Sequence, residues 1–370
     1  MTFSTQDHRF MQRALELAQE ALFITSPNPR VGCVLVNKDG LVIGEGYTQK
    51  AGEAHAEVQA LRQATNQGYD TKGATAYVTL EPCSHTGRTP PCSKAIINAG
   101  IARIVASITD PNPLVSGQGF EQLRSAGIKV DIGLGEVQAH SINEGFIKRM
   151  RFDKPLVRLK IASSLDGATA LLNGKSQWIT GAPAREHAHL WRARSCALLS
   201  GIGTILSDDP SLNVRFVPTP RQPKLVIIDA NLDTPASAAL FREKREVVIY
   251  CASMHPEKVK HLSQSGATMV LMPDSKNPNH VDLNAMLKDL GKKGINELHI
   301  EAGAGLNGSF IQQGLVDEFL IYLAPLILGH AAGWANLPIL EDLAMGTRLT
   351  FLESTHLEQD IFIRARPLNS

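Results

Sequence analysis

The spacing of hydrophobic residues along the chain predicts an alternation of helices and strands. Residues 10–22 carry apolar side chains at helical spacing between glutamine, glutamate and arginine residues, so they predict an amphipathic helix. Residues 31–36 predict a buried strand, and residues 41–46 its return after a turn at 37–40. This alternation is typical of an α/β layer. It continues with helices expected at 54–65, 92–99 and 120–126 and strands at 74–80, 103–108 and 130–133.

A break near Pro155 separates this series from a second one. A polar helix ends in the basic cluster of Lys148, Arg149 and Arg151, and Asp153-Lys154-Pro155 then interrupts it. The residue before a proline is displaced from the helical region, so we expect two domains, 1–152 and 153–370. No internal repeat relates them, which indicates two different chemistries. The second domain is expected to contain a helix at 184–194 and strands at 156–162, 224–229, 246–251, 297–301, 319–328 and 361–365.

Length and charge agree with two ordinary globular domains. The chain has 370 residues, about twice the common size of one domain. Its 37 basic and 36 acidic residues give a net charge of +1, so no excess charge favours nucleic acid or a membrane surface. The longest apolar run, 319–328, contains Pro325 and has half of the roughly 20 residues that cross a bilayer. Charged residues near the start also argue against a secretory signal, so a cytoplasmic protein is expected.

One group of side chains predicts a metal site. His55 and Glu57 lie at the start of the helix expected at 54–65, and Cys83 follows the strand expected at 74–80. Cys92 comes directly after Pro90-Pro91, at the start of another helix. A helix N-terminus stabilises a thiolate, the form of cysteine that binds metal. One imidazole and two thiolates suit tetrahedral zinc and leave one position for water, as in a catalytic site.

Each residue of this group also has an ordinary structural explanation. A single buried cysteine is usually a small hydrophobic residue, and we expect that role for Cys33, Cys196 and Cys251. His55, Cys83 and Cys92 differ because they occur together at strand ends and helix starts. Glu57, two residues from His55, is then expected to be the catalytic proton carrier.

The pattern His-x-Glu followed by Pro-Cys and a second Cys resembles the zinc-dependent deaminases. Common nucleobase deaminases have two residues between the cysteines, whereas this chain has eight. Residues 82–92, with 26–32, 44–46 and 110–115, resemble the deaminase half of the bifunctional riboflavin-biosynthesis deaminase/reductase family. That resemblance implies substrate contacts at Asn28, His85, Arg88, Asp110 and Asn112.

The second half contains weaker signals for a nucleotide cofactor. A strand at 298–301 leads into the glycine-rich segment 303–309 and then into a helix, and such a turn presents amide N–H groups to phosphate. The segment is a poor Rossmann fingerprint, because it lies near the end of the chain instead of after a first strand. Arg192 and Arg215 can each bind a phosphate in bidentate fashion. Trp178 suits either a ring-stacking contact or a core position, and Asp208 suits a turn.

Residues 163–167, 176–180, 204–210 and 303–309 are similar to the reductase half of the same family, which has a dihydrofolate-reductase-like fold. The residues leave NADPH and NADH as alternatives, and the resemblance implies NADPH. It implies substrate contacts at Ser176, Arg192, Leu212, Arg215 and Glu301. It implies cofactor contacts at Ala162, Trp178, Thr204, Asp208, Gly303, Ala304, Gly305, Leu306, Asn307, Gly308 and Ser309.

The expected protein is therefore a cytidine-deaminase-like α/β/α domain followed by a dihydrofolate-reductase-like α/β domain. The resemblance implies zinc-dependent deamination of a phosphoribosyl-diaminopyrimidine, then NADPH-dependent reduction of its ribosyl group to a ribityl chain. Two alternatives are a cytidine- or tRNA-type deaminase fused to an unrelated reductase, and a zinc-stabilised nucleic-acid-binding module. The long interval between the cysteines disfavours the first, and the neutral charge balance and Glu57 disfavour the second. We expect a small-molecule substrate, no nucleic-acid or membrane partner, and a homo-oligomer.

Overall fold

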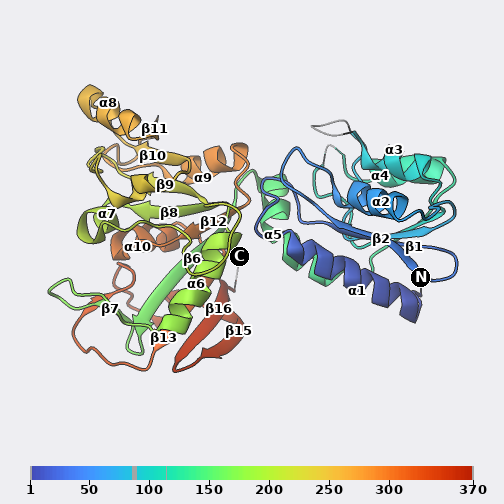
Figure 1. The fold of residues 1–370 in the computed structure, drawn as a ribbon. Coiled ribbons are helices and arrows are strands. Elements are labelled where there is room, and N and C mark those ends of the chain that lie inside the picture. Colours follow the sequence, from blue (N-terminus) through green and yellow to red (C-terminus); the bar gives the residue numbers. More distant parts are fainter. Residues whose placement is uncertain (1, 86–89, 114, 369–370) are drawn as a thin grey trace. The chain divides into compact units, whose positions relative to one another are not determined.

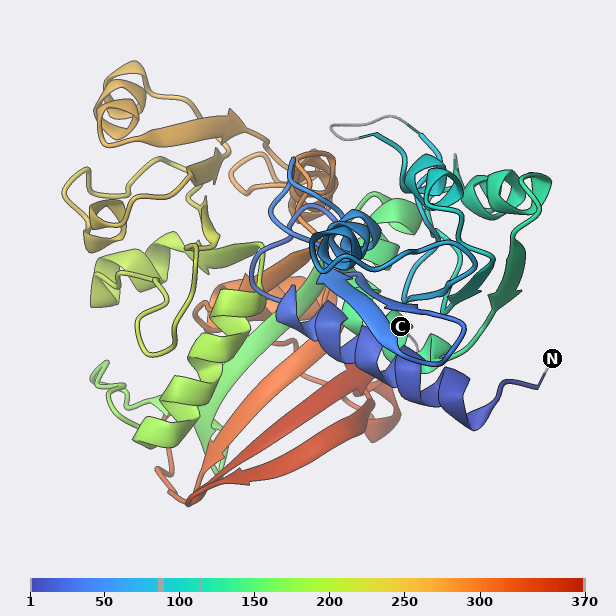
Figure 2. The same ribbon diagram turned by 45° about the vertical axis from the view of Figure 1, so that its right-hand side comes forward.

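The computed structural model describes residues 2–85, 90–113 and 115–368, which form two compact units. The first unit is Met1–Asp153 and the second is Lys154–Ser370. Within the described residues, no helix combines the length and apolar character needed to cross a bilayer. Each unit has its own mixed sheet, and Figures 1 and 2 show the strands and the helices that cover them.

The first unit is a five-stranded sheet with helices on both faces. Its strands lie in the order β2-β1-β3-β4-β5, with β1 antiparallel to β2 and β3, and β3, β4 and β5 parallel. Helix α1 packs on β1, and α5 contacts α1, while α2 packs on β1 and β2 and contacts α3. The elements are α1 (Thr5–Glu20), β1 (Gly32–Val36), β2 (Val42–Tyr47), α2 (Ala56–Asn66), β3 (Thr75–Val78), α3 (Cys92–Asn98), β4 (Arg103–Ala106), α4 (Gln118–Ser125), β5 (Lys129–Ile132) and α5 (Glu136–Phe152).

Glycines let the helices of this unit approach the sheet closely. A Cβ added to Gly32 on β1 would lie 1.9 Å from the carbonyl oxygen of Ala14 in α1. A Cβ on Gly46 of β2 would lie 2.4 Å from the carbonyl oxygen of Ala56, the first residue of α2. Both separations are far below van der Waals contact, so a side chain at either glycine would push a helix away. The N-terminus of α2, which carries His55 and Glu57, is thereby held against β2.

The second unit is built on a nine-stranded sheet. Its order is β11-β10-β9-β8-β12-β6-β13-β16-β15, parallel from β11 to β13, with an antiparallel hairpin of β15 and β16 at the edge beside β13. The elements are β6 (Leu156–Ser164), β7 (Ala168–Ala170), α6 (Ala182–Arg194), β8 (Ala197–Gly201), α7 (Ile202–Asp208), β9 (Lys224–Ile228), β10 (Val247–Cys251), α8 (Pro256–Gln264), β11 (Ala267–Leu271), α9 (Leu283–Lys292), β12 (Glu297–Ile300), α10 (Ala304–Gln312), β13 (Glu318–Ala324), β14 (Ala332–Gly333), β15 (Leu349–Leu357) and β16 (Asp360–Pro367).

Helix α6 covers the part of this sheet that lies next to the hairpin. Ala184, Ala188 and Trp191 of α6 pack with Leu320 and Tyr322 of β13 in a small buried cluster. Figure 2 shows α6 lying along β6 and β13. The C-terminal half of α6 therefore lies over the middle of the sheet, where Arg192 binds Glu301, the residue after β12.

Three expectations about elements were wrong in detail. The first helix starts at Thr5 instead of residue 10, because Ser4 and Asp7 form a capping box. The strand expected at 319–328 ends at Ala324, directly before Pro325, which cannot donate to the sheet. The glycine-rich segment at 303–309 is no loop: Gly303 is the N-cap and α10 begins at Ala304.

A buried ionic network joins the amino ends of the central strands in the second unit. Glu318 on β13 is fully buried and lies 3.5 Å from Arg158, 2.6 Å from Arg364 and 3.1 Å from Arg366. Burial opposes ionisation of this carboxyl, but Arg158 and Arg364 outweigh it and lower the pKa of Glu318 to about 2. The carboxylate is thus the counter-charge for three guanidinium groups.

We predict that Glu318→Gln lowers the free energy of unfolding by about 3 kcal/mol or more, because it leaves buried guanidinium groups without their counter-charge. Since folding lowers the pKa of Glu318 from 4.5 to about 2, its contribution is fully present above pH 4.5 and is lost as the pH falls through about 2. Urea titrations at pH 7 and below pH 4 measure both effects. Glu353→Gln, at the half-exposed partner of Arg364, is the control; an equal loss in both variants would contradict the network.

Candidate functional site

Three side chains from separate elements converge in the first unit. His55 is the N-cap of α2, Cys83 lies in the segment after β3, and Cys92 is the first residue of α3. The Nδ1 atom of His55 lies 3.3 Å from Sγ of Cys92 and 3.6 Å from Sγ of Cys83. The three donor atoms all lie within 4.8 Å of one another, and no fourth His, Cys, Asp or Glu joins the group among the described residues. This donor set fits zinc with one coordination position left over.

Backbone bonds bring the two cysteines together despite the eight residues between them. The amide of Cys92 donates to Sγ of Cys83 at 3.3 Å, and the amide of Ser93 donates to the carbonyl of Cys83 at 3.1 Å. Both donors belong to the first turn of α3, where amides have no partner within the helix. The start of α3 therefore closes onto the end of the Cys83 segment, whatever the length of the intervening loop.

Hydrogen bonds among His55, Cys83 and Cys92 shift the pKa values of these side chains. A hydrogen bond with the Cys92 thiol lowers the pKa of Cys83, and the same bond raises the pKa of Cys92. The pKa of His55 is raised, chiefly by its hydrogen bond with Cys83. The lowered pKa favours the thiolate of Cys83, which is the form of cysteine that binds a metal ion.

Glu57 lies beside this group as a buried acid. Its side chain is 5% exposed, in the first turn of α2. Burial raises the pKa of Glu57 to about 7, with a further contribution from the charge on Cys83. A carboxyl with a pKa near neutrality can take up a proton and release it again, which is the property of a general acid and base.

A second buried carboxylate, which the sequence did not single out, holds the neighbouring loop. Glu81 accepts backbone N–H bonds from Asp110 at 3.0 Å, Gly117 at 2.9 Å and Gly119 at 2.8 Å. A Cβ on Gly119 would lie 2.0 Å from the carbonyl oxygen of Pro82, so the loop lies directly on the strand end. Glu81, which is two residues before Cys83, therefore fixes the loop that carries Asp110. The sequence feature that could have identified Glu81 is its position at the end of an expected buried strand.

Two of the expected substrate residues of this unit, Asp110 and Asn112, lie in that loop. Asn112 donates its amide to the carboxylate of Asp110 at 2.8 Å, and burial raises the pKa of Asp110. His85 is exposed after Cys83, and its charge acts on Asp110. Asn28 is half-buried and donates its amide to the carbonyl of Thr25 at 2.8 Å. Arg88 lies outside the described residues.

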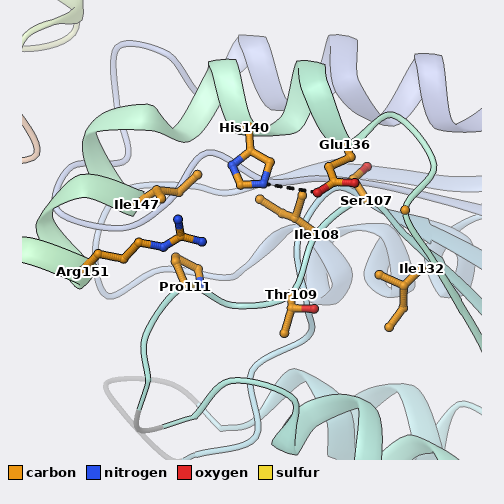
Figure 3. Close-up of a pocket in the computed structure, with 10 residues that line it drawn as sticks. Ser107, Ile108, Thr109, Pro111, Ile132, Glu136, His140, Ile147 and Arg151 are labelled. Carbon is orange, nitrogen blue, oxygen red and sulfur yellow. Dashed lines mark ion pairs between the residues drawn. The ribbon is translucent and has the colours of Figure 1, made fainter. Parts of the chain in front are cut away.

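A separate pocket of about 190 Å³ lies at the carboxyl ends of β4 and β5. Glu136 and His140 of α5 form an ion pair at 3.7 Å on its wall, and the side chain of Arg151 extends from the same helix (Figure 3). Pro111, the neighbour of Asp110, contributes to the opposite wall. None of the three metal-ligand candidates lines this pocket, so it is distinct from the metal group.

In the second unit, two helices begin side by side at the ends of neighbouring parallel strands. Gly201 ends β8 and caps α7, and Gly303 follows β12 and caps α10. An added Cβ on Gly303 would lie 4.0 Å from the hydroxyl oxygen of Thr204, while one on Gly203 or Gly305 meets no described atom within 4 Å. Exposed backbone at paired helix starts fits a phosphate-bearing cofactor. The carboxyl edge of a parallel sheet is also the usual place for such a ligand.

The other expected cofactor residues have different surroundings. Asn307 is buried and donates to the carbonyl of Trp334 at 2.8 Å, and a Cβ on Gly308 would strike the Asn336 carbonyl oxygen at 2.0 Å. These two residues hold α10 against the segment around Trp334. Trp178 is 64% exposed, with the Arg185 guanidinium 4.5 Å from its ring centroid, which excludes the core position. Ala162, Ala304, Leu306 and Ser309 are half-buried, as is the expected substrate residue Ser176, and Asp208 is exposed at the end of α7.

Arg192 and Glu301, both expected to contact substrate, are bound to each other. Nε and Nη2 of Arg192 lie 2.5 and 2.8 Å from the two carboxylate oxygens of Glu301. The remaining terminal nitrogen, Nη1, donates to the carbonyl of Asn213 at 2.8 Å. A bidentate phosphate contact by Arg192 would require this pair to separate. Arg215 is exposed instead, and its backbone follows Leu212, which has a positive φ of 47°.

Comparisons with known proteins find matches for both units. The family model described as the cytidine and deoxycytidylate deaminase zinc-binding region matches residues 4–108, and the RibD C-terminal domain matches residues 155–363. The riboflavin biosynthesis protein RibD of Escherichia coli is 46% identical over 366 residues, covering 96% of this chain and 98% of that protein. The chain belongs to the RibD family. The Haemophilus influenzae RibD is 44% identical and covers 99% of both chains.

Solved structures of RibD proteins share the whole fold. Acinetobacter baumannii RibD matches with a TM-score of 0.89 and 43% identity over 98% of this chain and 99% of that one. A Thermotoga maritima protein, described as a diaminohydroxyphosphoribosylaminopyrimidine deaminase and 5-amino-6-(5-phosphoribosylamino)uracil reductase, matches with a TM-score of 0.86 and 33% identity over the same shares. The expected α/β fold with a deaminase-like and a reductase domain is thereby confirmed, as is the family.

We predict that Glu81→Leu frees the loop from Asp110 to Gly119 and lowers the free energy of unfolding of the first unit by about 3 kcal/mol, because several backbone N–H groups lose a charged acceptor. Hydrogen exchange should accelerate at the amides of Asp110, Gly117 and Gly119. Glu121→Leu, at an exposed carboxylate on α4, is the matched control. Unchanged protection of these amides in Glu81→Leu would contradict the assignment.

Proposed function

We propose that this chain is a bifunctional riboflavin-pathway enzyme that first deaminates 2,5-diamino-6-(5-phosphoribosylamino)pyrimidin-4-one and then reduces its ribosyl group with NADPH. The observation that carries the proposal is the convergence of His55, Cys83 and Cys92 beside the buried Glu57. The likeness of the chain to RibD proteins over nearly its whole length supports the substrate and the second reaction. We place the deaminase in residues 1–152 and the reductase in residues 153–370.

In the deaminase, His55, Cys83 and Cys92 would hold zinc. When bound, zinc supplies a Lewis acid that lowers the pKa of a water molecule toward ~7. Glu57 takes the proton of the attacking water and passes it to the pyrimidine ring nitrogen. It then takes the proton of the hydroxyl group that was added to the ring carbon and delivers it to the departing amine, so that ammonia leaves and a carbonyl remains. A pKa near 7 suits Glu57 to both directions of transfer. Asn28, His85, Arg88, Asp110 and Asn112 are proposed to contact the substrate.

In the reductase, the paired helix starts at Gly201 and Gly303 would receive the phosphate groups of NADPH, with Thr204 between them. NADPH supplies the hydride for the carbonyl carbon of the ring-opened sugar, and water supplies the proton for its oxygen. Exposed Trp178 is placed to stack on a planar ring. Arg215 is proposed to bind the substrate phosphate, while Glu301 and Arg192 order the adjoining surface.

We predict that Glu57→Gln retains zinc, because the ligands are untouched, but loses deamination by at least about a hundredfold, because the amide cannot carry a proton. Reduction of the deaminated intermediate should remain unchanged. Zinc content by mass spectrometry, ammonia release, and NADPH absorbance measure the three properties separately. Deaminase turnover at the wild-type rate in this variant would refute the proton-carrier role.

The substrate itself is tested by comparing pyrimidines. Ammonia release from the phosphoribosyl-diaminopyrimidine, and none from cytidine or deoxycytidylate, is the expected result. NADPH oxidation should begin only after ammonia release. Turnover of cytidine alone would favour the alternative of a cytidine-type deaminase fused to another reductase.

We also propose a cytoplasmic homo-oligomer. All five cysteines are free thiols, which suits a reducing compartment. The edge strand β15 and the segment before it expose large apolar side chains, among them Leu343 at 93% and Phe351 at 67%. An exposed edge strand with apolar side chains can pair with the edge strand of a second chain, or another segment can cover it.

We predict that Phe351→Glu converts an oligomer to a monomer, since a charge at the contact would have to be buried. Light scattering coupled to size exclusion measures the mass. Val137→Glu, at an equally exposed apolar residue on α5, should leave the mass unchanged. An unaltered oligomer in Phe351→Glu would remove β15 from the interface.

A further inference from the structure

The segment 211–215, which leads to the exposed Arg215, is held by side chains at every residue. Arg245 donates to the carbonyl oxygens of Ser211 at 2.6 Å and Leu212 at 2.5 Å. Gln222 accepts from the amide of Val214 at 2.8 Å and donates to its carbonyl at 2.9 Å. A loop in which every residue has at least one backbone group bound in this way loses little conformational entropy when a ligand arrives.

Helix α6 supplies the last two bonds of this set. Arg192 donates to the carbonyl of Asn213 at 2.8 Å, and His189, one turn earlier, accepts the amide of Arg215 on Nδ1 at 3.2 Å. Residues three apart on a helix lie on the same face, so one face of α6 holds two successive points of the loop. Arg192 is itself fixed by Glu301, which ties the loop to β12.

His189 is suited to this bond because it is buried and neutral. The side chain is 3% exposed, and its ring lies 4.6 Å from the ring of Phe216 in an edge contact. Burial and the charges of Arg192 and Arg215 lower the pKa of His189 to about 3. A neutral ring leaves the lone pair on Nδ1 available to the Arg215 amide, and Nε2 lies 3.5 Å from Nη1 of Arg192.

The guanidinium of Arg215 projects from this braced loop. Its Nη1 donates to the side-chain oxygen of Asn213 at 3.1 Å, and its central carbon lies 4.9 Å above the ring of Phe216. Both contacts orient the group, while the residue as a whole is exposed. Its position therefore depends on the backbone at residues 213–216, which His189 fixes.

We propose that His189 is a positioning residue that fixes the Arg215 loop for the phosphate group of the reductase substrate. This inference rests on the proposed function, because it takes the anion at Arg215 to be the phosphate of the ribosyl or ribityl chain. A pre-placed guanidinium binds phosphate without first ordering its loop, so the benefit appears in KM for a phosphorylated substrate.

The experiment compares His189→Leu, His189→Asn and Arg215→Gln, each measured with the phosphorylated intermediate and with its dephosphorylated analogue. His189→Leu should raise KM for the phosphorylated substrate about tenfold at unchanged kcat, a loss of about 1.4 kcal/mol. KM for NADPH and for the dephosphorylated analogue should stay unchanged. His189→Asn, whose side-chain oxygen can accept the Arg215 amide, should restore most of the affinity.

A double variant separates positioning from general damage to the fold. In an Arg215→Gln background, His189→Leu should add less than twofold to KM, because the group it positions is gone. His187→Leu, at a half-buried histidine of α6 that contacts Tyr322 instead of the loop, is the control for loss of a helix histidine.

Failure of the inference is distinguishable from failure of the proposed function. A wild-type protein that does not reduce the phosphorylated intermediate with NADPH would overturn the proposed function and this inference together. If the wild type is active but His189→Leu leaves KM unchanged, the positioning role is overturned alone. An equal rise of KM for the phosphorylated and dephosphorylated substrates would overturn it as well.

Discussion

The unpaired amide groups at helix starts, placed where strands end, are the interaction on which both sites depend. The first turn of α3 gives the amides of Cys92 and Ser93 to the sulfur and carbonyl of Cys83, which brings the second cysteine to the first. In the second unit the starts of α7 and α10 lie at the ends of β8 and β12, with exposed glycine backbone at Gly203 and Gly305. The same local feature therefore serves a thiolate in one unit and suits a phosphate in the other, because both are anions.

Buried carboxylates bind neighbouring segments of the chain and hold them in place. Glu81 binds backbone amides and thereby fixes a loop beside the metal group. Glu318 binds three guanidinium groups at the amino ends of the strands, and Glu301 binds one at the carboxyl edge. Each acid has its charge matched by several donors, which is the condition under which a buried carboxylate stabilises a fold. Glu57 is the exception: burial raises its pKa instead of donors lowering it, and it is the acid expected to move protons.

The sequence predicted local features well and long-range ones unevenly. His55 and Cys92 stand at helix starts as expected, because Pro90-Pro91 and the apolar periodicity are local signals. The meeting of Cys83 with His55 depends on the pairing of β3 with its neighbours, which the sequence indicated only through the ligand types at strand ends and helix starts and through the family pattern. Glu81 was missed because its four backbone partners lie 29 to 39 residues away, so no local sequence pattern indicates these hydrogen bonds. The sequence also left open whether Trp178 is exposed or part of the core. It did not predict the pairing of Arg192 with Glu301, because composition does not say which arginine a carboxylate will bind.

That last pairing bears on the phosphate contact proposed for a chain with almost no net charge. In the second unit Arg158, Arg194, Arg364 and Arg366 are bound to Glu297 or Glu318, and Arg192 is bound to Glu301. Arg215 differs, because its described partners are the neutral Asn213 side chain and the ring of Phe216. These contacts orient the Arg215 guanidinium, and neither of them pairs it with a carboxylate. A phosphate contact at Arg215 therefore needs no excess of positive charge over the whole protein.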